Sequence, residues 1–403
     1  MLPMESCGGG PMGGGPAHPT VIVREDCVRM KIVVAMDSFK GSLTAVRACA
    51  VVAEAVGSVR PGTEIVIKPM GDGGEGTAAA LMAAAGGTWV AKTVMGPLPE
   101  KQVEAGFVWL ADSRTAVVEM ATASGLGLLS PDQQNPLKTT TYGTGQLIGA
   151  AIEHGAKRLL LAVGGSATVD GGVGAAMALG WTFLARDGST ISLGGSGLAA
   201  LDRIVAPDAA LPVEVDVLCD VDNPLCGPHG AARVYGPQKG ATPEMVETLE
   251  TSLSHLAVLV QAQVGQSVGD LSGAGAAGGL AAGAVAFMDA RLVSGIETVM
   301  SQSRLQEAMA GADWVVTGEG CFDDQSLRGK VVSGVTRMAR HGCTKVAVLA
   351  GQVRLPTRRY RDAGVRVALP CMSTGMDLQH AIANGAALLD AAARRWASDY
   401  LPG

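Results

Sequence analysis

The sequence predicts an α/β protein with two domains, one of which is built from both ends of the chain. Near the start, short runs of β-branched residues alternate with Gly-rich polar loops and Ala-rich segments, a pattern typical of β-loop-α units. The same alternation returns near the C-terminus, whereas the middle opens with strand-like segments separated by turns. We therefore expect a discontinuous Rossmann-like parallel-sheet domain with an inserted second α/β domain.

The first part of the chain contains two expected strands, at 31–35 and 64–68, because each is a short run rich in Val and Ile. An Ala-rich helix is expected after each strand, at 43–56 and 78–85. The polar loops between strand and helix would then lie at the carboxyl ends of parallel strands, which is where such sheets bind ligands.

The middle of the chain is expected to begin with strand-like segments and to continue in β-loop-α order. Strand-like segments are expected at 88–110 and 115–121, and strands at 157–163 and 213–218. Helices are expected at 144–154, at 175–179 after a Gly-rich loop, and at 243–264. The last of these is the clearest, because its apolar residues recur at helical spacing.

The C-terminal part again alternates strands with helices. Strands are expected at 314–316, 345–350 and 365–369, and helices at 331–341, 358–363 and 378–397. We expect the Rossmann-like domain to comprise 30–87 plus 290–403 and the inserted domain to comprise 88–289. The active site would lie in the cleft between the two domains.

The composition indicates a large apolar core and argues against several classes of protein. Of 403 residues, 48% are hydrophobic and only 17% are charged, which is unlike a disordered chain. Only residues 1–29, which open with a Gly- and Pro-rich stretch, are expected to form a disordered N-terminal extension. The net charge is −6, so a nucleic-acid partner, which usually selects a basic protein, is not expected.

The sequence carries no signal for secretion or for a membrane. The first residues lack the basic and apolar regions of a signal peptide, and the longest uncharged apolar stretch, 271–288, is mostly Gly and Ala. The eight cysteines form no C-x-x-C pair, as is ordinary for a reduced intracellular protein. We therefore expect a cytoplasmic protein with small-molecule partners, and the sequence leaves a homo-oligomer open.

Five loops combine glycine with charged or hydroxyl side chains, and most of them follow an expected strand. They are DSFKGS (37–42), GDGGEGT (71–77), GGSATVDGG (164–172), CDVDNP with GPQKG (219–224 and 236–240), and TGEGCFDDQSLRGK (317–330). Phosphoryl transfer needs backbone N–H groups near phosphate oxygens, cations, and carboxylates that hold Mg²⁺ or accept a hydroxyl proton. Any one loop could be only a tight turn, but their recurrence in a chain poor in charge favours a phosphate-handling site.

Two further motifs resemble nucleotide-binding sequences without their context. The glycines at 273–278 match G-x-G-x-x-G, but they follow a polar segment rather than a strand. Gly329-Lys330 looks like the end of a P-loop, but the next residue is Val331 and no Gly lies five positions before Gly329. The sequence therefore contains no Walker A motif.

Taken together, seven motifs resemble the bacterial glycerate kinase family, type I. They are DSFKGSLTA, PMGDGGEGT, TTYGTGQLI, GGSATVDGGVGAAMALG, CDVDNPLCGPHGAARVYGPQKGA, GAGAAGGL and TGEGCFDDQSLRGK. The resemblance runs from Met30 nearly to the C-terminus. It implies a kinase that phosphorylates D-glycerate with ATP, mostly giving 2-phosphoglycerate, and a two-domain α/β architecture. The sequence departs from the family pattern at three positions. The family more usually has asparagine in place of Val169 and arginine in place of His229 and Cys321.

The chemistry of phosphoryl transfer assigns the candidate site residues to roles. For catalysis we expect Lys40 and either Asp72 or Asp323, which would orient or deprotonate the attacking hydroxyl. For Mg²⁺ we expect Asp220 or Glu319. Lys40 and Lys239 would meet the glycerate carboxylate or the phosphates. The expected phosphate cradle consists of Gly164, Gly165, Ser166, Ala167 and Thr168, and the remaining expected substrate contacts are Ser38 and Asp170.

Two other functions remain as alternatives at this point. A non-catalytic sensor of a sugar acid or nucleotide would keep binding while losing its metal and base groups, but Asp72, Glu319 and Asp323 are all present. An NAD-dependent oxidoreductase would use the glycines at 273–278.

Overall fold

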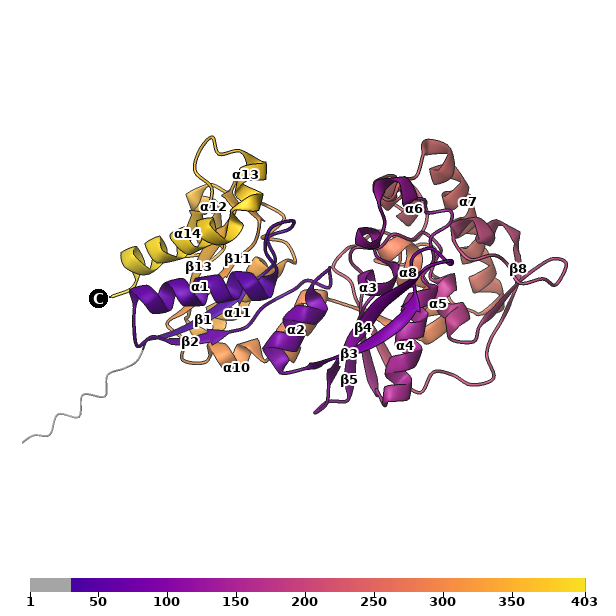
Figure 1. Ribbon diagram of the computed structural model, residues 1–403, viewed down its shortest axis with the longest axis horizontal. Helices are drawn as coiled ribbons and strands as arrows, with labels where there is room; N and C mark the ends of the chain where they lie inside the picture. Colours follow the sequence, from indigo (N-terminus) through magenta and orange to yellow (C-terminus); the bar gives the residue numbers. More distant parts are fainter. Residues whose placement is uncertain (1–29, 403) are drawn as a thin grey trace, which may run out of the picture.

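The computed structural model describes residues 30–402, which form two main sheets (Figure 1). The first sheet has five strands in the order β15-β13-β11-β1-β2, and every neighbouring pair is parallel. Its strands are β1 (Lys31–Met36), β2 (Glu64–Ile67), β11 (Trp314–Gly318), β13 (Lys345–Ala350) and β15 (Val367–Pro370). Both ends of the chain therefore contribute to one parallel sheet, as predicted.

The second sheet has six strands in the order β10-β9-β6-β5-β4-β3. Its strands are β3 (Thr88–Met95), β4 (Gln102–Leu110), β5 (Thr115–Glu119), β6 (Arg158–Ala162), β9 (Glu214–Leu218) and β10 (Arg291–Val293). The pairs from β5 to β10 are parallel, while β3, β4 and β5 pair antiparallel. Two small two-stranded sheets, β7 (Thr182–Ala185) with β8 (Leu201–Val205) and β12 (Cys321–Phe322) with β14 (Gln352–Val353), complete the strands of the described residues.

Helices cover both main sheets. They are α1 (Ala45–Val59), α2 (Thr77–Ala85), α3 (Ala121–Ser124), α4 (Tyr142–His154), α5 (Val173–Ala178), α6 (Ala231–Tyr235), α7 (Pro243–Gln263), α8 (Ala276–Met288), α9 (Gly295–Gln302), α10 (Leu305–Met309), α11 (Val331–Gly342), α12 (Thr357–Asp362), α13 (Leu378–Ala383) and α14 (Gly385–Tyr400). None of the helices in the described part is long and apolar enough to cross a bilayer.

The predicted single helix at 378–397 is wrong, because the chain breaks at Asn384 into α13 and α14. Asn384 has φ −110° and ψ 18°, and its side-chain amide donates to the carbonyl oxygen of His380 at 2.9 Å. This local hydrogen bond competes with helical pairing, as asparagine side chains often do.

One face of the five-stranded sheet is covered by α1 and α14, which lie side by side in Figure 1. The first helix begins where Thr44 accepts a hydrogen bond from the Arg47 N–H at 3.2 Å, a usual N-cap arrangement. The interior residues of both helices join a core with the sheet, in which Trp314 and Trp396 meet edge to face at 5.4 Å. This face is therefore closed by apolar packing, and the loops that carry chemistry lie at the strand ends.

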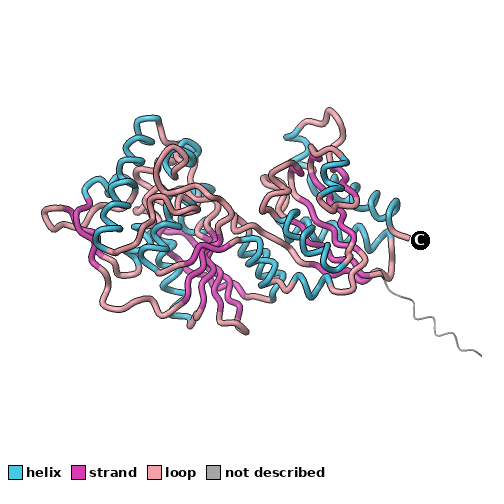
Figure 2. Tube along the Cα trace, turned by 180° about the vertical axis from the view of Figure 1, so that it is seen from behind, coloured by secondary structure: helices cyan, strands magenta, loops and turns pink. Residues whose placement is uncertain are grey.

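The other face of the five-stranded sheet shares a core with the second sheet. Buried residues of β1, β11 and β13 belong to one cluster with residues of β4, β6 and β9. The helices α2 and α9 contribute to the same cluster, through Leu81 and Val299 among others. In the view from behind, helices lie between the two groups of strands (Figure 2). The sheets are therefore joined by a continuous apolar layer built around α2 and α9.

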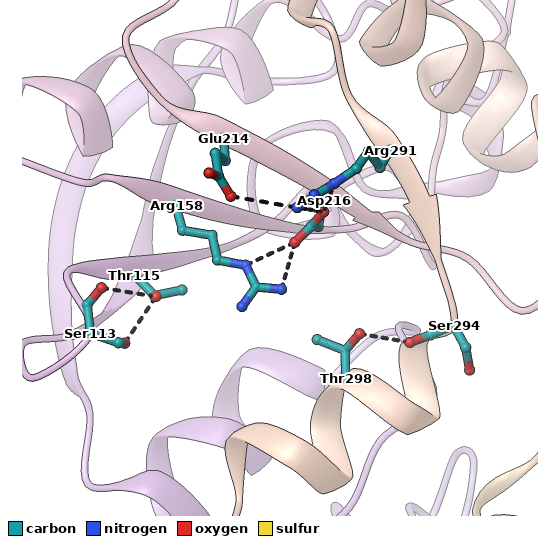
Figure 3. A network of polar contacts seen from close by, with 8 residues as sticks. All are labelled: Ser113, Thr115, Arg158, Glu214, Asp216, Arg291, Ser294 and Thr298. Atoms are coloured by element: carbon teal, nitrogen blue, oxygen red, sulfur yellow. Dashed lines mark hydrogen bonds and ion pairs between the residues drawn. The ribbon is translucent and has the colours of Figure 1, made fainter.

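A buried ion network fixes the edge of the six-stranded sheet (Figure 3). The Asp216 side chain on β9 is 1% exposed and accepts from Arg158 at 2.8 Å and from Arg291 at 2.9 Å, both through Nε. Because Arg158 begins β6 and Arg291 begins β10, one carboxylate pins both neighbouring strands to β9. The strand β10 thus pairs with the middle of the chain, just beyond the expected boundary at 290, and the division into 30–87 plus 290–403 and 88–289 stays a prediction.

Candidate active site

Three carboxylates follow neighbouring strands of the five-stranded sheet. Asp37 comes directly after β1, Asp72 follows β2, and Glu319 comes directly after β11. The Asp37 N–H donates to the Gly318 carbonyl oxygen at 2.9 Å, which sets the first loop against the third. Since parallel strands end at the same edge of a sheet, these side chains lie close together, as expected for a site at this edge.

The loop that contains Asp72 also reaches the six-stranded sheet. Its Gly73 lies so close to the end of β9 that an added Cβ would stand 2.7 Å from the Leu218 carbonyl oxygen. The Gly164 N–H, after β6, is 3.4 Å from the Gly73 carbonyl oxygen, and any side chain on Gly164 would overlap Gly74. The glycines therefore allow backbones from both sheets to meet, which no larger residue would permit.

Burial and neighbouring charges raise the pKa values of two of these carboxyls, Asp37 and Glu319. Burial, reinforced by the charge of Asp72, raises the pKa of Asp37 to about 8. Burial also raises the pKa of Glu319, while the Ser326 hydroxyl and the charge of Lys330, whose Nζ lies 3.9 Å from Oε2, lower it. The other oxygen of Glu319, Oε1, is buried and has no hydrogen-bond partner within residues 30–402. Glu319 Oε1 is therefore available to bind a proton or a cation.

The two candidates for a catalytic base differ in their place relative to this group. The charge of Asp72 acts on the pKa values of Asp37, Asp220 and Glu319, whereas among these carboxyls Asp323 acts on Glu319 alone. Asp72 is thus the electrostatic centre of the acidic group. The choice between Asp72 and Asp323, which the sequence left open, stays a prediction. The wider effect of the Asp72 charge favours Asp72.

The two predicted metal ligands have unequal freedom. Asp220 accepts from the backbone N–H groups of Gly295 and Ile296, at 3.0 and 3.1 Å, with one oxygen for each. It therefore caps the N-terminus of α9, where a negative charge is favourable. Glu319, by contrast, keeps one oxygen unbonded. Residues 30–402 contain no group of three metal-ligating side chains, so the metal assignment of both residues stays a prediction, and Glu319 fits it better.

The predicted phosphate cradle at 164–168 is held from beneath by Lys239. The Lys239 side chain is only 2% exposed, and its Nζ donates to Ser166 Oγ and to the Thr168 carbonyl oxygen, each at 2.7 Å. Burial lowers the pKa of Lys239 to about 7, with Asp170 acting in the opposite direction. The loop is thus shaped around a buried amine that a nearby anion would readily charge.

Two backbone N–H groups of this loop are unpaired in the described chain. Ala167 donates its N–H to Ser124, and the Gly165 carbonyl oxygen accepts from Leu126. Within the described chain, however, the N–H groups of Gly165 and Ser166 find no acceptor. Gly165 is exposed and has a left-handed φ of 71°. Adjacent unpaired N–H groups of this kind can bind an anion, although the predicted role of the loop stays untested.

Asp170 lies behind the cradle, where it is 1% exposed. One of its oxygens accepts from the Gly172 N–H at 3.1 Å, and the other accepts from the N–H and Oγ1 of Thr141 at 2.8 and 2.9 Å. Burial raises the pKa of Asp170, while these donors lower it. The predicted substrate contact of Asp170 stays a prediction, and its geometry favours a structural role that joins the loop to α4.

Ser38 and Lys40 lie on the first loop, whose backbone at Phe39 and Lys40 runs close to Gly320. Ser38 is half-buried and donates its N–H to Asp37 Oδ1 at 2.6 Å, whereas Lys40 is exposed. The Lys40 side chain is in no ion pair of the described residues. The predicted role of Lys40 in catalysis and substrate binding stays a prediction.

The glycines at 273–278 serve close packing. Residues 273–280 are all buried, and α8 is kinked by left-handed backbone at Ala277, Gly278 and Gly279. A side chain at Gly278 would overlap the Thr168 carbonyl, and the Gly278 carbonyl oxygen accepts from the Gly171 N–H at 3.1 Å. The segment therefore supports the back of the 164–172 loop.

Two cavities of the described structure lie elsewhere, with volumes of about 610 and 740 Å³. The first is lined by Trp181 and Phe287 and the second by Trp314 and Arg340, among others, and none of the predicted site residues lines either cavity. The cleft expected between the domains accordingly stays a prediction.

Sequence reasoning missed two residues of this region. Asp37 was read as part of a polar loop, although its position directly after a buried strand was a usable signal. Glu119 was read within a strand, yet it is 6% exposed and accepts from the N–H groups of Gly76 and Ala78 at 2.8 and 3.1 Å. Its only signal was a single acid at the end of an apolar run.

The raised pKa of Asp37 predicts a pH-dependent cost to stability. The folded pKa of about 8 lies above the ordinary value of 3.8, so stability should be lost as the pH rises from about 4 to about 8. With EDTA present, Asp37→Asn should leave Tm unchanged near pH 4 and raise it relative to the unmodified protein near pH 8.

Thermal unfolding across this pH range is the measurement, with exposed Asp208→Asn as the control. A Tm difference for Asp37→Asn that stays constant across the range would contradict the raised pKa.

Comparison with known proteins gives one consistent result. The model of the glycerate kinase family matches residues 32–401. The chain is 41% identical to the glycerate kinase of Bacillus subtilis (strain 168), over 91% of this chain and 96% of that one. It is 42% identical to the glycerate 2-kinase of Escherichia coli (strain K12), over 80% and 86%.

A solved structure extends this result to the fold. It is a crystal structure described as a glycerate kinase 2 from Salmonella typhimurium LT2, which matches with a TM-score of 0.80 at 39% identity. The match covers 92% of this chain and 98% of that chain. The sequence and the fold agree, and the chain belongs to the glycerate kinase family.

Proposed function

We propose that this protein transfers the γ-phosphoryl group of ATP to the 2-hydroxyl of D-glycerate, giving 2-phosphoglycerate and ADP. Family membership supports glycerate phosphorylation, and the name of the Escherichia coli relative supports the position of the phosphate. The observation that carries the proposal is the meeting of the Asp72 loop with the Gly164–Ser166 loop. This contact supports a site in which Asp72 would meet the acceptor hydroxyl and the N–H groups of Gly165 and Ser166 would meet the phosphate oxygens.

In this arrangement Asp72 takes the proton of the glycerate 2-hydroxyl while its oxygen attacks the γ-phosphorus in line with the leaving ADP oxygen. The bond from the γ-phosphorus to the ADP oxygen breaks as the new P–O bond forms. Exposed Lys40 is free to bind the glycerate carboxylate. The N–H groups of Gly165 and Ser166, with Lys239 beneath them, stabilise charge on the phosphates.

The residues present fit a bound Mg²⁺. The buried, unpartnered oxygen of Glu319 is a hard anionic donor, and Asp72 lies within the same acidic group. Mg²⁺ usually takes one or two protein carboxylates together with substrate phosphates and water, which suits a site without a three-residue cluster. When bound, the ion would neutralise charge on the phosphate oxygens, and Glu319 would hold it. Asp220 remains a second candidate, although both of its oxygens already accept N–H groups.

The two alternatives have less support. The glycines at 273–278 pack against the Thr168 loop, so they present no free surface for the dinucleotide of an oxidoreductase. A non-catalytic sensor would not need an acidic group with a buried, unsatisfied oxygen.

We place the reaction in the cytoplasm, because the cysteines of the described residues are all free thiols, as in a reducing compartment. They are Cys49, Cys219, Cys226, Cys321, Cys343 and Cys371.

The test is ADP release with D-glycerate, ATP and Mg²⁺, with L-glycerate, no acceptor, and excess EDTA as controls. We expect turnover that needs both D-glycerate and Mg²⁺, and ³¹P NMR of the product should show phosphate on the 2-oxygen. ATP turnover that ignores D-glycerate would contradict the kinase assignment, and a 3-phosphate product would contradict only the position.

A further inference from the structure

Two carboxylates of the six-stranded sheet each hold the start of a helix that lies between the sheets. Glu119, at the end of β5, accepts from Gly76 N–H through Oε1 and from Ala78 N–H through Oε2, at 2.8 and 3.1 Å. Asp220, just after β9, binds the N–H groups of Gly295 and Ile296 in the same way. The two helices that begin there are α2 and α9, which contact each other in the shared core.

The loop with Asp72 lies between these two attachments. Gly76 ends this loop, and Gly295 approaches the Asp72 carbonyl so closely that a side chain there would overlap it. Four of the six residues at 71–76 are glycine, and glycine leaves the backbone conformationally free. The position of Asp72 is therefore set by contacts from outside the loop.

We infer that Glu119 is a positioning residue for the transfer reaction, because it fixes the Asp72 loop against the six-stranded sheet. Asp220 supports the same loop from the side of α9. The inference rests on the proposed function, because it concerns where Asp72 stands relative to the phosphates. The phosphate-side loop at 164–168 follows β6, the strand that pairs with β5. Glu119 thus ties the base to the sheet that carries the phosphate cradle.

The need for a carboxylate follows from the bond pattern. Both oxygens of Glu119 accept a backbone N–H, and its 6% exposure leaves almost no water to replace either bond. Glutamine at this position offers one oxygen and one NH₂ group, which cannot accept from an N–H. Glu119→Gln therefore breaks one of the two attachments while it keeps the size of the side chain.

The test compares Glu119→Gln with Asp216→Asn in the full-length protein. Asp216 is also a buried carboxylate of this sheet, but its partners are Arg158 and Arg291. For Glu119→Gln we expect kcat to fall by about 100-fold, which is the loss that a small misplacement of a reacting group can cause. The KM for ATP should stay within about twofold of the unmodified protein. Backbone hydrogen exchange at Gly76 and Ala78 should accelerate. Asp216→Asn should lower Tm and leave kcat per folded molecule unchanged.

Several outcomes would overturn the inference. One is unchanged kcat in Glu119→Gln, and another is an equal kcat loss in Asp216→Asn at the same folded fraction. If the unmodified protein shows no turnover with D-glycerate and ATP, the proposed function fails by itself, and unchanged exchange at Gly76 and Ala78 would then still overturn the attachment. Should Glu119→Gln not fold, Glu119→Asp, which is shorter by one methylene, takes its place with the same expectations.

Discussion

Replacing Asp72 with asparagine should lower kcat by about 10²–10⁴-fold, the usual contribution of a positioned general base. The substitution removes the group that takes the hydroxyl proton but keeps the local fold. In the structure Asp72 Oδ1 accepts from the Gly74 N–H at 3.1 Å, and the asparagine oxygen can accept that bond. The KM for ATP should change little, because the proposed phosphate contacts lie on the other loop. Steady-state kinetics with D-glycerate, together with Tm to confirm folding, is the measurement.

Asp323 offers a matched control for this substitution. Its Oδ1 accepts from the N–H of Gln325, two residues on, at 2.9 Å, so Asp323→Asn makes the same chemical change in the same kind of turn. We expect a loss of less than about tenfold there, because Asp323 stands outside the centre of the acidic group. A larger loss in Asp323→Asn than in Asp72→Asn would reverse the assignment of the base.

Replacing Lys239 with methionine should reduce kcat/KM for ATP by about 10²–10³-fold, the scale of losing one well-placed electrostatic contact. The buried amine joins Ser166 Oγ to the Thr168 carbonyl oxygen. Methionine fills a similar space and offers neither bond, so the phosphate-facing N–H groups of the loop lose their fixed direction. The exposed Lys92 of β3 gives the control, since Lys92→Met makes the same chemical change on the surface of the six-stranded sheet, outside the 164–168 loop.

Proton uptake provides an independent readout for Lys239. Its pKa of about 7 reflects burial, and a bound phosphate nearby would favour the charged amine. At about pH 8, ATP binding to the unmodified protein should therefore take up protons, measured by calorimetry in buffers of different ionisation enthalpy. Lys239→Met should bind without that uptake. Identical uptake in both proteins would show that Lys239 does not sense the phosphates.

The sequence allowed the strand-end loops to be placed, because β-loop-α order forces them to one edge of a parallel sheet. It did not show that the loop at 71–76 meets Gly164, since that contact joins two different sheets and depends on how they pack. The GPQKG motif looks like an exposed turn, and lysine is rarely buried. The burial of the Lys239 side chain could therefore not be predicted from the sequence. Local pattern predicts elements, whereas burial of a single polar residue depends on distant segments.

The same reason explains the carboxylates. Asp220 was expected to bind a metal because it follows a strand in an acidic loop, but the helix it caps begins far along the chain at Gly295. Glu119 likewise accepts a hydrogen bond from Gly76, which lies 43 residues earlier in the sequence. Both attachments join segments that sequence reasoning treats separately. A carboxylate in such a loop can therefore bind the backbone, and the metal role of Asp220 stays a prediction.

The apolar layer around α2 and α9 has a consequence for how the molecule behaves as a whole. Residues of both sheets share one apolar cluster with these helices. On that side, each sheet therefore depends on the other half of the molecule to cover its apolar side chains. Excising either half would expose apolar side chains that are now covered, and each fragment would be prone to aggregate. The two halves are therefore expected to stabilise each other, so that loss of structure in one lowers the stability of the other.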